Sequence, residues 1–219
     1  MPKYFKENYP NVVDPVANEV TTNYSNYYFA LNAFIVSCMG LISATVGGIL
    51  SDKYEKKGYL MTKAYVCIAA GIGGIPTSCI CLLLNNNFWV SITFLGLEYL
   101  VAESWFAPAI AMILNTISPE NKGFAVSAFV YLSTMSGTLG TWVCGFLSDR
   151  FVDTVTTYDV ISKKDTTVAT NPEMYGKILT IMIIISYGGS IPFFWLAGRE
   201  YTAHKNKEKE KEEQTTQGF

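Results

Sequence analysis

Two glutamates, Glu98 and Glu103, lie in an otherwise apolar stretch of the sequence. A charged side chain deep in a membrane costs roughly 3 kcal/mol or more unless it faces water, a partner or the interior of a helix bundle. On a helix, side chains five positions apart point about 140° apart, so the two cannot both line one narrow cavity. Trp105 and Pro108 follow Glu103 and predict an interrupted helix near a site. We therefore predict a substrate or proton pathway that involves Glu103, Glu98, Trp105 and Pro108. Within it we expect Glu103 to face the cavity and Glu98 to face a neighbouring helix.

An alternative stays open for both glutamates. Either could be protonated, or could accept hydrogen bonds from Ser, Thr or Asn across the bundle, with no part in transport.

A second set of polar residues follows the first long apolar run. Gly48 lies near the end of this run. Asp52 is the first charge after this run, and Lys53, Lys56 and Lys57 come next. A carboxylate at a helix end can accept from backbone N–H groups and pair with a cation, which would lock one side of a bundle. The sequence thus predicts a gating loop, with a plain solvated loop as the alternative.

These residues must be positioned by membrane helices. Half of the 219 residues are apolar and 14% are aromatic. A bilayer core about 30 Å thick needs roughly 20 apolar residues of helix. Five such helices in a soluble protein would leave too little polar surface to cover them, so we predict an all-α membrane protein. Its expected first to fifth spans are 27–50, 64–84, 88–113, 124–147 and 178–196.

The remaining segments are expected to lie outside the membrane. Residues 1–26 form a charged lead-in without a cleavable signal, and residues 199–219 form a charged tail, either solvated helix or disorder. The loop 148–177 is polar, too long and mixed for a hairpin, and is expected to cover a pore mouth. Ten of the 16 lysines and arginines fall on the face that carries the tail. This bias predicts a cytoplasmic C-terminus.

The sequence contains two similar exits from the membrane. Gly-x-Leu-Ser-Asp ends the first span at Asp52 and the fourth at Asp149. Three spans separate these points, which places them on opposite faces, and a weaker pair of Gly/Pro motifs relates the second and fifth spans. Such inverted repeats are typical of secondary transporters. On this pattern the third span needs a counterpart before the first, and residues 1–11 resemble the end of such a helix, with interfacial aromatic residues.

Small residues recur every four positions in the first and fourth spans. At this spacing they let helix backbones approach closely in a membrane. We therefore predict helix-packing ridges. The predicted ridge residues are Gly40, Ala44 and Gly48 in the first span and Ser133, Gly137, Thr141 and Gly145 in the fourth.

The sequence predicts no cofactor, metal site or nucleic-acid partner. The five cysteines fall inside apolar spans, and their spacing fits no zinc site. The single histidine, His204, lies in the charged tail.

Two stretches resemble the major facilitator superfamily. "GGILSDKYEKKG", from Gly47 to Gly58, resembles the family's loop signature between the second and third helices of each half. The segment from Glu98 to Asp149, with Glu-x-Trp-x-x-Pro followed by a small-residue-rich helix, is similar to the C-terminal half of Spinster-like members. On this resemblance the five spans correspond to the eighth to twelfth helices of a twelve-helix transporter, and the similarity covers 1–198.

The resemblance implies a secondary active transporter for an amphipathic organic or lipid-like solute, with proton coupling as a further hypothesis. The family's transport path runs between two halves, and the first half has no counterpart here. We therefore expect no transport by this chain alone, and we expect membrane lipids and either the other transporter half or another membrane subunit as partners. The alternative is a degenerate half retained as a structural subunit of a membrane complex. An intramembrane enzyme that uses the two glutamates ranks last, because no third catalytic group joins them.

Overall fold

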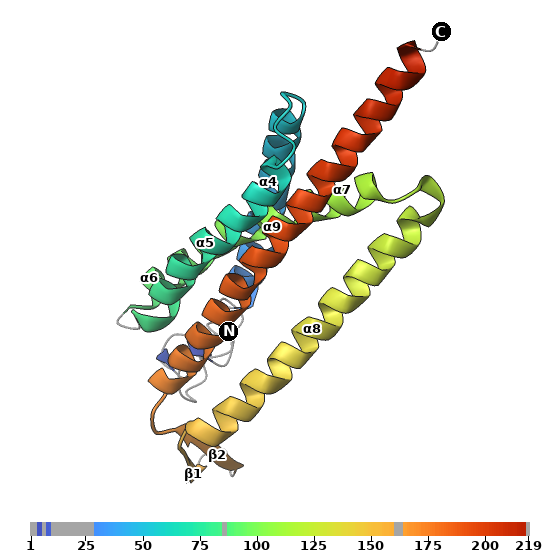
Figure 1. Ribbon diagram of the computed structural model, residues 1–219. Helices are drawn as coiled ribbons and strands as arrows, with labels where there is room; N and C mark the ends of the chain where they lie inside the picture. The colour runs from blue at the N-terminus through green and yellow to red at the C-terminus, as the bar shows by residue number, and fades with distance from the viewer. Residues whose placement is uncertain (1–3, 6–7, 10–28, 85–86, 160–163, 218–219) are drawn as a thin grey trace.

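The computed structural model describes residues 4–5, 8–9, 29–84, 87–159 and 164–217, most of them in long helices (Figure 1). The predicted all-α membrane architecture is confirmed, with one short β-hairpin added. The helical elements are η1 (Ile35–Met39), α4 (Gly40–Glu55), α5 (Thr62–Leu83), α6 (Phe88–Ala102), η2 (Glu103–Trp105), α7 (Phe106–Thr116), η3 (Pro119–Asn121), α8 (Lys122–Phe151) and α9 (Glu173–Gln217). Of the predicted lead-in 1–26, only Tyr4, Phe5, Asn8 and Tyr9 are described.

Within the described residues, four helices are long and apolar enough to cross a membrane. They are Phe29–Glu55, Thr62–Leu83, Phe88–Thr116 and Glu173–Thr215. The predicted fourth span forms α8, a helix of 30 residues that is not among these four. Its many Ser, Thr and Gly residues lower its hydropathy. The predicted fifth span and the charged tail form one continuous helix, α9, whose exposed end carries a Lys205–Glu208 ion pair.

The α6–α7 segment is interrupted where the sequence predicted it. Pro108 has no backbone N–H, so the carbonyl of Ser104 loses its usual donor four residues ahead. The backbone tightens into η2 at this point. At the other end of the segment, the Asn87 side chain accepts from the N–H of Trp89 and caps α6. Asn85 and Asn86, which precede Asn87, lie outside the described residues.

Helix α5 lies at the centre of the arrangement, where it packs along both α9 and α6. Helix α4 packs against η2 and α7. Helix α8 leaves α7 and runs back to the opposite end of the molecule, where the hairpin leads into α9 (Figure 1). The turn between α4 and α5 and the hairpin after α8 therefore lie at opposite ends of the bundle.

The predicted absence of a hairpin in the loop 148–177 is wrong. Strands β1 (Thr154–Asp159) and β2 (Lys164–Ala169) pair antiparallel, with Thr154 opposite Ala169 and Asp159 opposite Lys164. Helix α8 continues to Phe151 and α9 begins at Glu173, so much less chain remains between them than the apolar spans suggested. Thr and Val residues, which favour strands, fill this interval.

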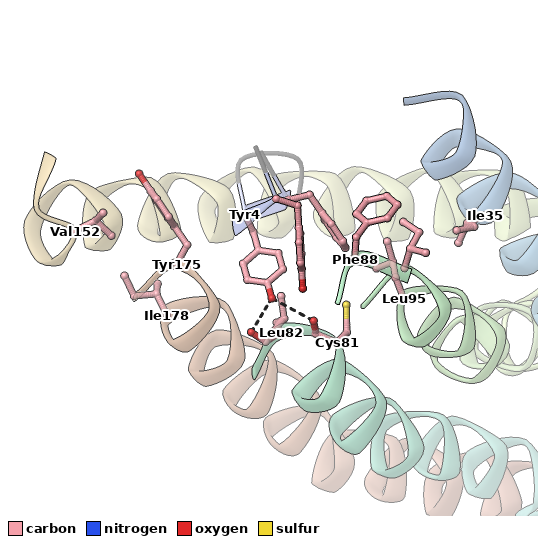
Figure 2. Packing of buried hydrophobic residues seen from close by; sticks show 12 residues of the cluster. Tyr4, Ile35, Cys81, Leu82, Phe88, Leu95, Val152, Tyr175 and Ile178 are labelled. Atoms are coloured by element: carbon pink, nitrogen blue, oxygen red, sulfur yellow. Dashed lines mark hydrogen bonds between the residues drawn. The ribbon is translucent and has the colours of Figure 1, made fainter. Parts of the chain in front are cut away.

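The main apolar core lies at the hairpin end of the bundle (Figure 2). The Tyr4 hydroxyl donates to the carbonyl oxygens of Leu82, at 2.9 Å, and Cys81, at 3.3 Å, which are among the last carbonyls of α5. The rings of Phe5 and Tyr9 pack edge-on against Phe88. Tyr4 and Phe5 are buried, so these rings form core contacts and not the exposed interfacial belt that the sequence suggested.

Candidate functional site

A buried glutamate–tyrosine pair joins α6 to α9. Glu98 is only 8% exposed, and the Tyr187 hydroxyl donates to its Oε1 at 2.6 Å. A Cβ at Gly74 of α5 would lie 2.8 Å from Cε2 of Tyr187 and 3.1 Å from the Cβ of Ala102. Only a glycine at this position leaves room for the tyrosine ring between α5 and α6. Glu98 thus contacts a side chain of another helix, α9.

Tyr187 also lines a space beside this pair. A groove of about 540 Å³ lies between α8 and α9. Apolar side chains of α9, among them Leu179 and Met182, form one wall, and Gly137 and Thr141 of α8 are part of the other. Tyr187 is therefore in contact both with the groove, which it lines, and with the Glu98 carboxylate, to which its hydroxyl donates.

A smaller cavity of about 170 Å³ lies on another side of Tyr187. Trp105 and Phe194 are among its lining residues, with ring centroids 5.9 Å apart. Trp105 also meets Phe129 of α8, and its carbonyl accepts from the Cys67 thiol at 3.5 Å. The interrupted helix thus contributes an aromatic wall next to the buried pair.

Glu103 lies elsewhere. It is half-buried in η2 on the side of α4, where a Cβ at Gly40 would come within 3.8 Å of its Cγ. Neither of these two spaces has Glu103 in its lining, whereas the sequence placed it on the cavity side. The two glutamates are five positions apart, so Glu103 points to a different side of the helix from Glu98. Pro108 is buried behind it and acts through the backbone of Ser104.

Sequence reasoning missed Tyr187. A tyrosine within the predicted fifth span was a usable signal, because a phenol hydroxyl in an apolar setting needs a polar partner. It directly precedes Gly188 and Gly189, in the Gly/Pro motif that relates the fifth span to the second.

A second polar cluster ties α4, α5, α7 and α9 together at the end opposite the hairpin. Lys63, 1% exposed, donates to Oδ1 of Asp52 at 2.8 Å and to Oε2 of Glu55. The Tyr201 hydroxyl donates to Oε1 of Glu55 and accepts from the Asn115 amide at 3.2 Å. We call these five residues the ion-pair cluster.

The cation in this cluster differs from the prediction. Asp52 pairs with Lys63 and not with the exposed Lys53, Lys56 or Lys57. Lys63 begins the apolar run of α5, so its ammonium group must fold back to a carboxylate once the helix is buried. Gly48 serves packing, since a Cβ there would lie 3.2 Å from the Cβ of Ala107.

The contributions within the cluster are unequal. The Asp52 side chain is 58% exposed, so water screens its pairing and it adds little stability. The Glu55 side chain is only 19% exposed and is shared by Lys63 and Tyr201. Removing one partner of a buried pair strands the other charge, which is costly. The Glu55–Lys63 pair is therefore the part of the cluster that contributes most to stability.

The two predicted packing ridges behave differently. On α4, the Gly40–Ala44 face packs toward η2 and α7, and a Cβ at Gly47 would clash with the backbone carbonyl of Ser104. On α8, a Cβ at Gly137 or Gly145 would meet no described atom within 4 Å. Ser133 and Thr141 of that ridge are exposed as well. The α8 ridge thus lies open along the groove.

Asp52 and Asp149 lie at opposite ends of the molecule. Asp52 belongs to the ion-pair cluster, which includes Tyr201 on α9, while Asp149 ends α8 next to the hairpin (Figure 1). Helix α9 spans roughly 40 Å from Glu173 to Tyr201 at about 1.5 Å per residue. Asp149 is exposed and forms no ion pair with any residue that the structure describes.

Comparisons with known proteins give one distant similarity. No family model and no solved structure matches the chain. An MFS-type efflux pump from Mycolicibacterium smegmatis is 25% identical over 117 residues, which is 52% of this chain and 26% of that protein. The match therefore covers about a quarter of the length of its relative. This chain is therefore distantly similar, over about half of its length, to one protein of the major facilitator type.

Proposed function

We propose that this chain forms part of a secondary active transporter for an amphipathic organic or lipid-like solute, with Glu98 as the proton-binding group. The Glu98–Tyr187 pair beside the groove carries this proposal. A buried carboxylate in a membrane helix is expensive and marks an ion or substrate pathway by default. The distant likeness to an efflux pump supports the same class of function.

The groove suits an amphipathic solute. Leu179, Met182 and Ile183 offer apolar surface for a hydrocarbon portion, and Ser186 and Tyr187 offer hydroxyls for a polar portion. When Glu98 is ionised, its carboxylate accepts the hydrogen bond from the Tyr187 hydroxyl and holds that hydroxyl in place. Protonation of Glu98 weakens that hydrogen bond and frees the hydroxyl to contact solute. Proton binding and solute binding are thereby coupled through one tyrosine.

The ion-pair cluster would act as the lock at one end. It joins the α4–α5 turn to α9 through Glu55, so these elements cannot separate until Lys63 and Tyr201 release that carboxylate. The sequence predicted a gating role for Asp52. We assign this role mainly to Glu55 and Lys63, and Asp52, which is exposed, contributes less.

Transport should need further membrane helices. The α8 ridge and the groove lie open in the described residues, and the match covers about a quarter of its relative. We propose that another half or subunit packs on α8 and closes the groove. A purely structural role would use the same face of α8, but it would not need solute binding or a titrating Glu98.

Photolabelling tests the binding step on the chain itself. The purified chain in lipid nanodiscs is irradiated with a diazirine-bearing lysophospholipid, and labelled peptides are mapped by mass spectrometry at pH 5 and pH 8. We expect saturable labelling at Cys144 and Met182 in the groove that changes with pH. The pH dependence should disappear in Glu98→Gln and persist in the matched variant Glu103→Gln.

Two results would overturn the proposal. Equal labelling of the groove and of the exposed outer face of α8, with no competition by unlabelled lysolipid, would remove the solute site and favour the structural role. Unaltered pH dependence in Glu98→Gln would remove the proton-binding group.

A further inference from the structure

The turn between α4 and α5 carries more positive charge than its own carboxylates neutralise. From Ser51 to Lys63 it contains two carboxylates, Asp52 and Glu55, and four lysines. Both carboxylates bind the same cation, Lys63. The buried lysine thus uses the acidic groups that could otherwise neutralise the surface lysines.

The three other lysines of the turn are exposed. Lys53, Lys56 and Lys57 form no ion pair with any residue in the described part of the chain. The ammonium group of Lys57 lies 5.4 Å from the centre of the Tyr54 ring, which fixes the direction of this side chain. Three cations that have no ion-pair partner among the described residues therefore cluster at the end of two apolar helices.

An apolar pocket of about 730 Å³ adjoins these cations. Tyr54, Leu60, Met61 and Tyr65 are among its lining residues on the turn side, and α9 contributes Thr202. The sharp turn that shapes it depends on Gly58, whose φ of 96° disfavours any residue with a side chain. The pocket is thus open and mostly apolar, with hydroxyls at its edge.

We propose that this turn and pocket bind an anionic phospholipid. Tyrosine and lysine at the ends of apolar helices lie at the level of lipid headgroups. The phosphate would contact Lys53, Lys56 and Lys57, and the first part of an acyl chain would lie along Tyr54, Leu60 and Met61. Charge complementarity selects an anionic lipid over a zwitterionic one, and the apolar pocket selects a lipid over free phosphate. This site is separate from the groove and does not depend on the transport proposal.

Native mass spectrometry of the full chain in detergent tests the site. The chain is titrated with phosphatidylglycerol and, separately, with phosphatidylcholine of the same acyl composition. We expect saturable binding with preference for phosphatidylglycerol. Surface lysines each change binding to anionic lipid by roughly fivefold. The Lys53→Gln, Lys56→Gln and Lys57→Gln triple variant should therefore lose most of the preference.

The matched control removes three lysines from the exposed end of α9, as Lys207→Gln, Lys209→Gln and Lys211→Gln. It changes the net charge by the same amount and should keep the preference. Equal loss in both triple variants would mean a general charge effect and would overturn the proposal. So would equal binding of the two lipids, or displacement of phosphatidylglycerol by an equal concentration of glycerol phosphate, which has no acyl chain.

Discussion

Helices α4 and α8 have the same pattern of small residues and use it in opposite ways. On α4, Gly47 and Gly48 lie against Ser104 and Ala107 so closely that side chains would not fit. On α8, Gly137 has open space beside it. The pattern therefore shows where a helix can be approached closely, but it does not say whether a partner is present.

The difference follows from what each helix meets. Helix α4 lies against η2, where Pro108 leaves the Ser104 carbonyl without its helical donor and a glycine can approach it. Helix α8 is attached near its two ends, through Phe129 on Trp105 and Val152 in the main core. Along its middle, the hydroxyls of Thr134, Thr138 and Thr141 donate to carbonyls of α8 itself.

The largest effect should come from filling the closest contact. Gly47→Leu would push a side chain into the Ser104 backbone, which cannot move without breaking η2. We expect a loss of about 3 kcal/mol in the free energy of unfolding, measured by titration with sodium dodecyl sulfate in mixed micelles. Wild-type stability in this variant would show that the α4 contact is looser than described.

The second-largest loss of stability is expected in the ion-pair cluster, which holds α4. Among the described residues, α8 has no such cluster. Lys63→Met strands the mostly buried Glu55 carboxylate, and we expect a loss of about 2 kcal/mol by the same titration. The matched variant Lys57→Met removes an exposed lysine of the same turn and should change stability by less than about 0.5 kcal/mol. Equal effects of the two variants would contradict the assignment of Lys63 as the central cation.

A smaller effect is expected at the buried pair. Tyr187→Phe removes the hydrogen bond to Glu98 and keeps the ring, so the loss should be about 1 kcal/mol, as for other hydrogen bonds between membrane helices. Tyr131→Phe on the exposed face of α8 is the control and should change nothing measurable. Tyr187→Phe should also abolish the pH dependence of photolabelling, whereas Tyr131→Phe should retain it.

The smallest effect on stability is expected at the open ridge. Gly137→Leu should change the free energy of unfolding of the isolated chain by less than about 0.5 kcal/mol, because nothing described lies beside it. It should nevertheless reduce groove labelling and any assembly with a partner helix. A loss as large as that of Gly47→Leu would mean that α8 packs in the isolated chain after all.

Much of the fold could be predicted from local patterns. Long apolar runs must satisfy their backbone groups internally in a membrane, so they predict helices of about the observed extent. Pro108 predicted the break at η2 because a missing N–H acts within one turn of helix. The same locality explains why Glu98 and Glu103 could be placed on different sides. The structure of charged residues that follow an apolar run was harder to predict. Helix α9 continues as helix well past its apolar part.

The partners of the polar groups were decided by tertiary structure. Glu98 meets Tyr187 across 89 positions of sequence, and Glu55 meets Tyr201 across 146. No local spacing encodes such contacts, because they depend on how α6 and α4 are placed relative to α9 in the bundle. The sequence determined which residues must find a partner, through the cost of leaving charge or hydroxyls unpaired in an apolar setting. Packing determined which partner each one found, and it left the small-residue face of α8 open while it filled that of α4.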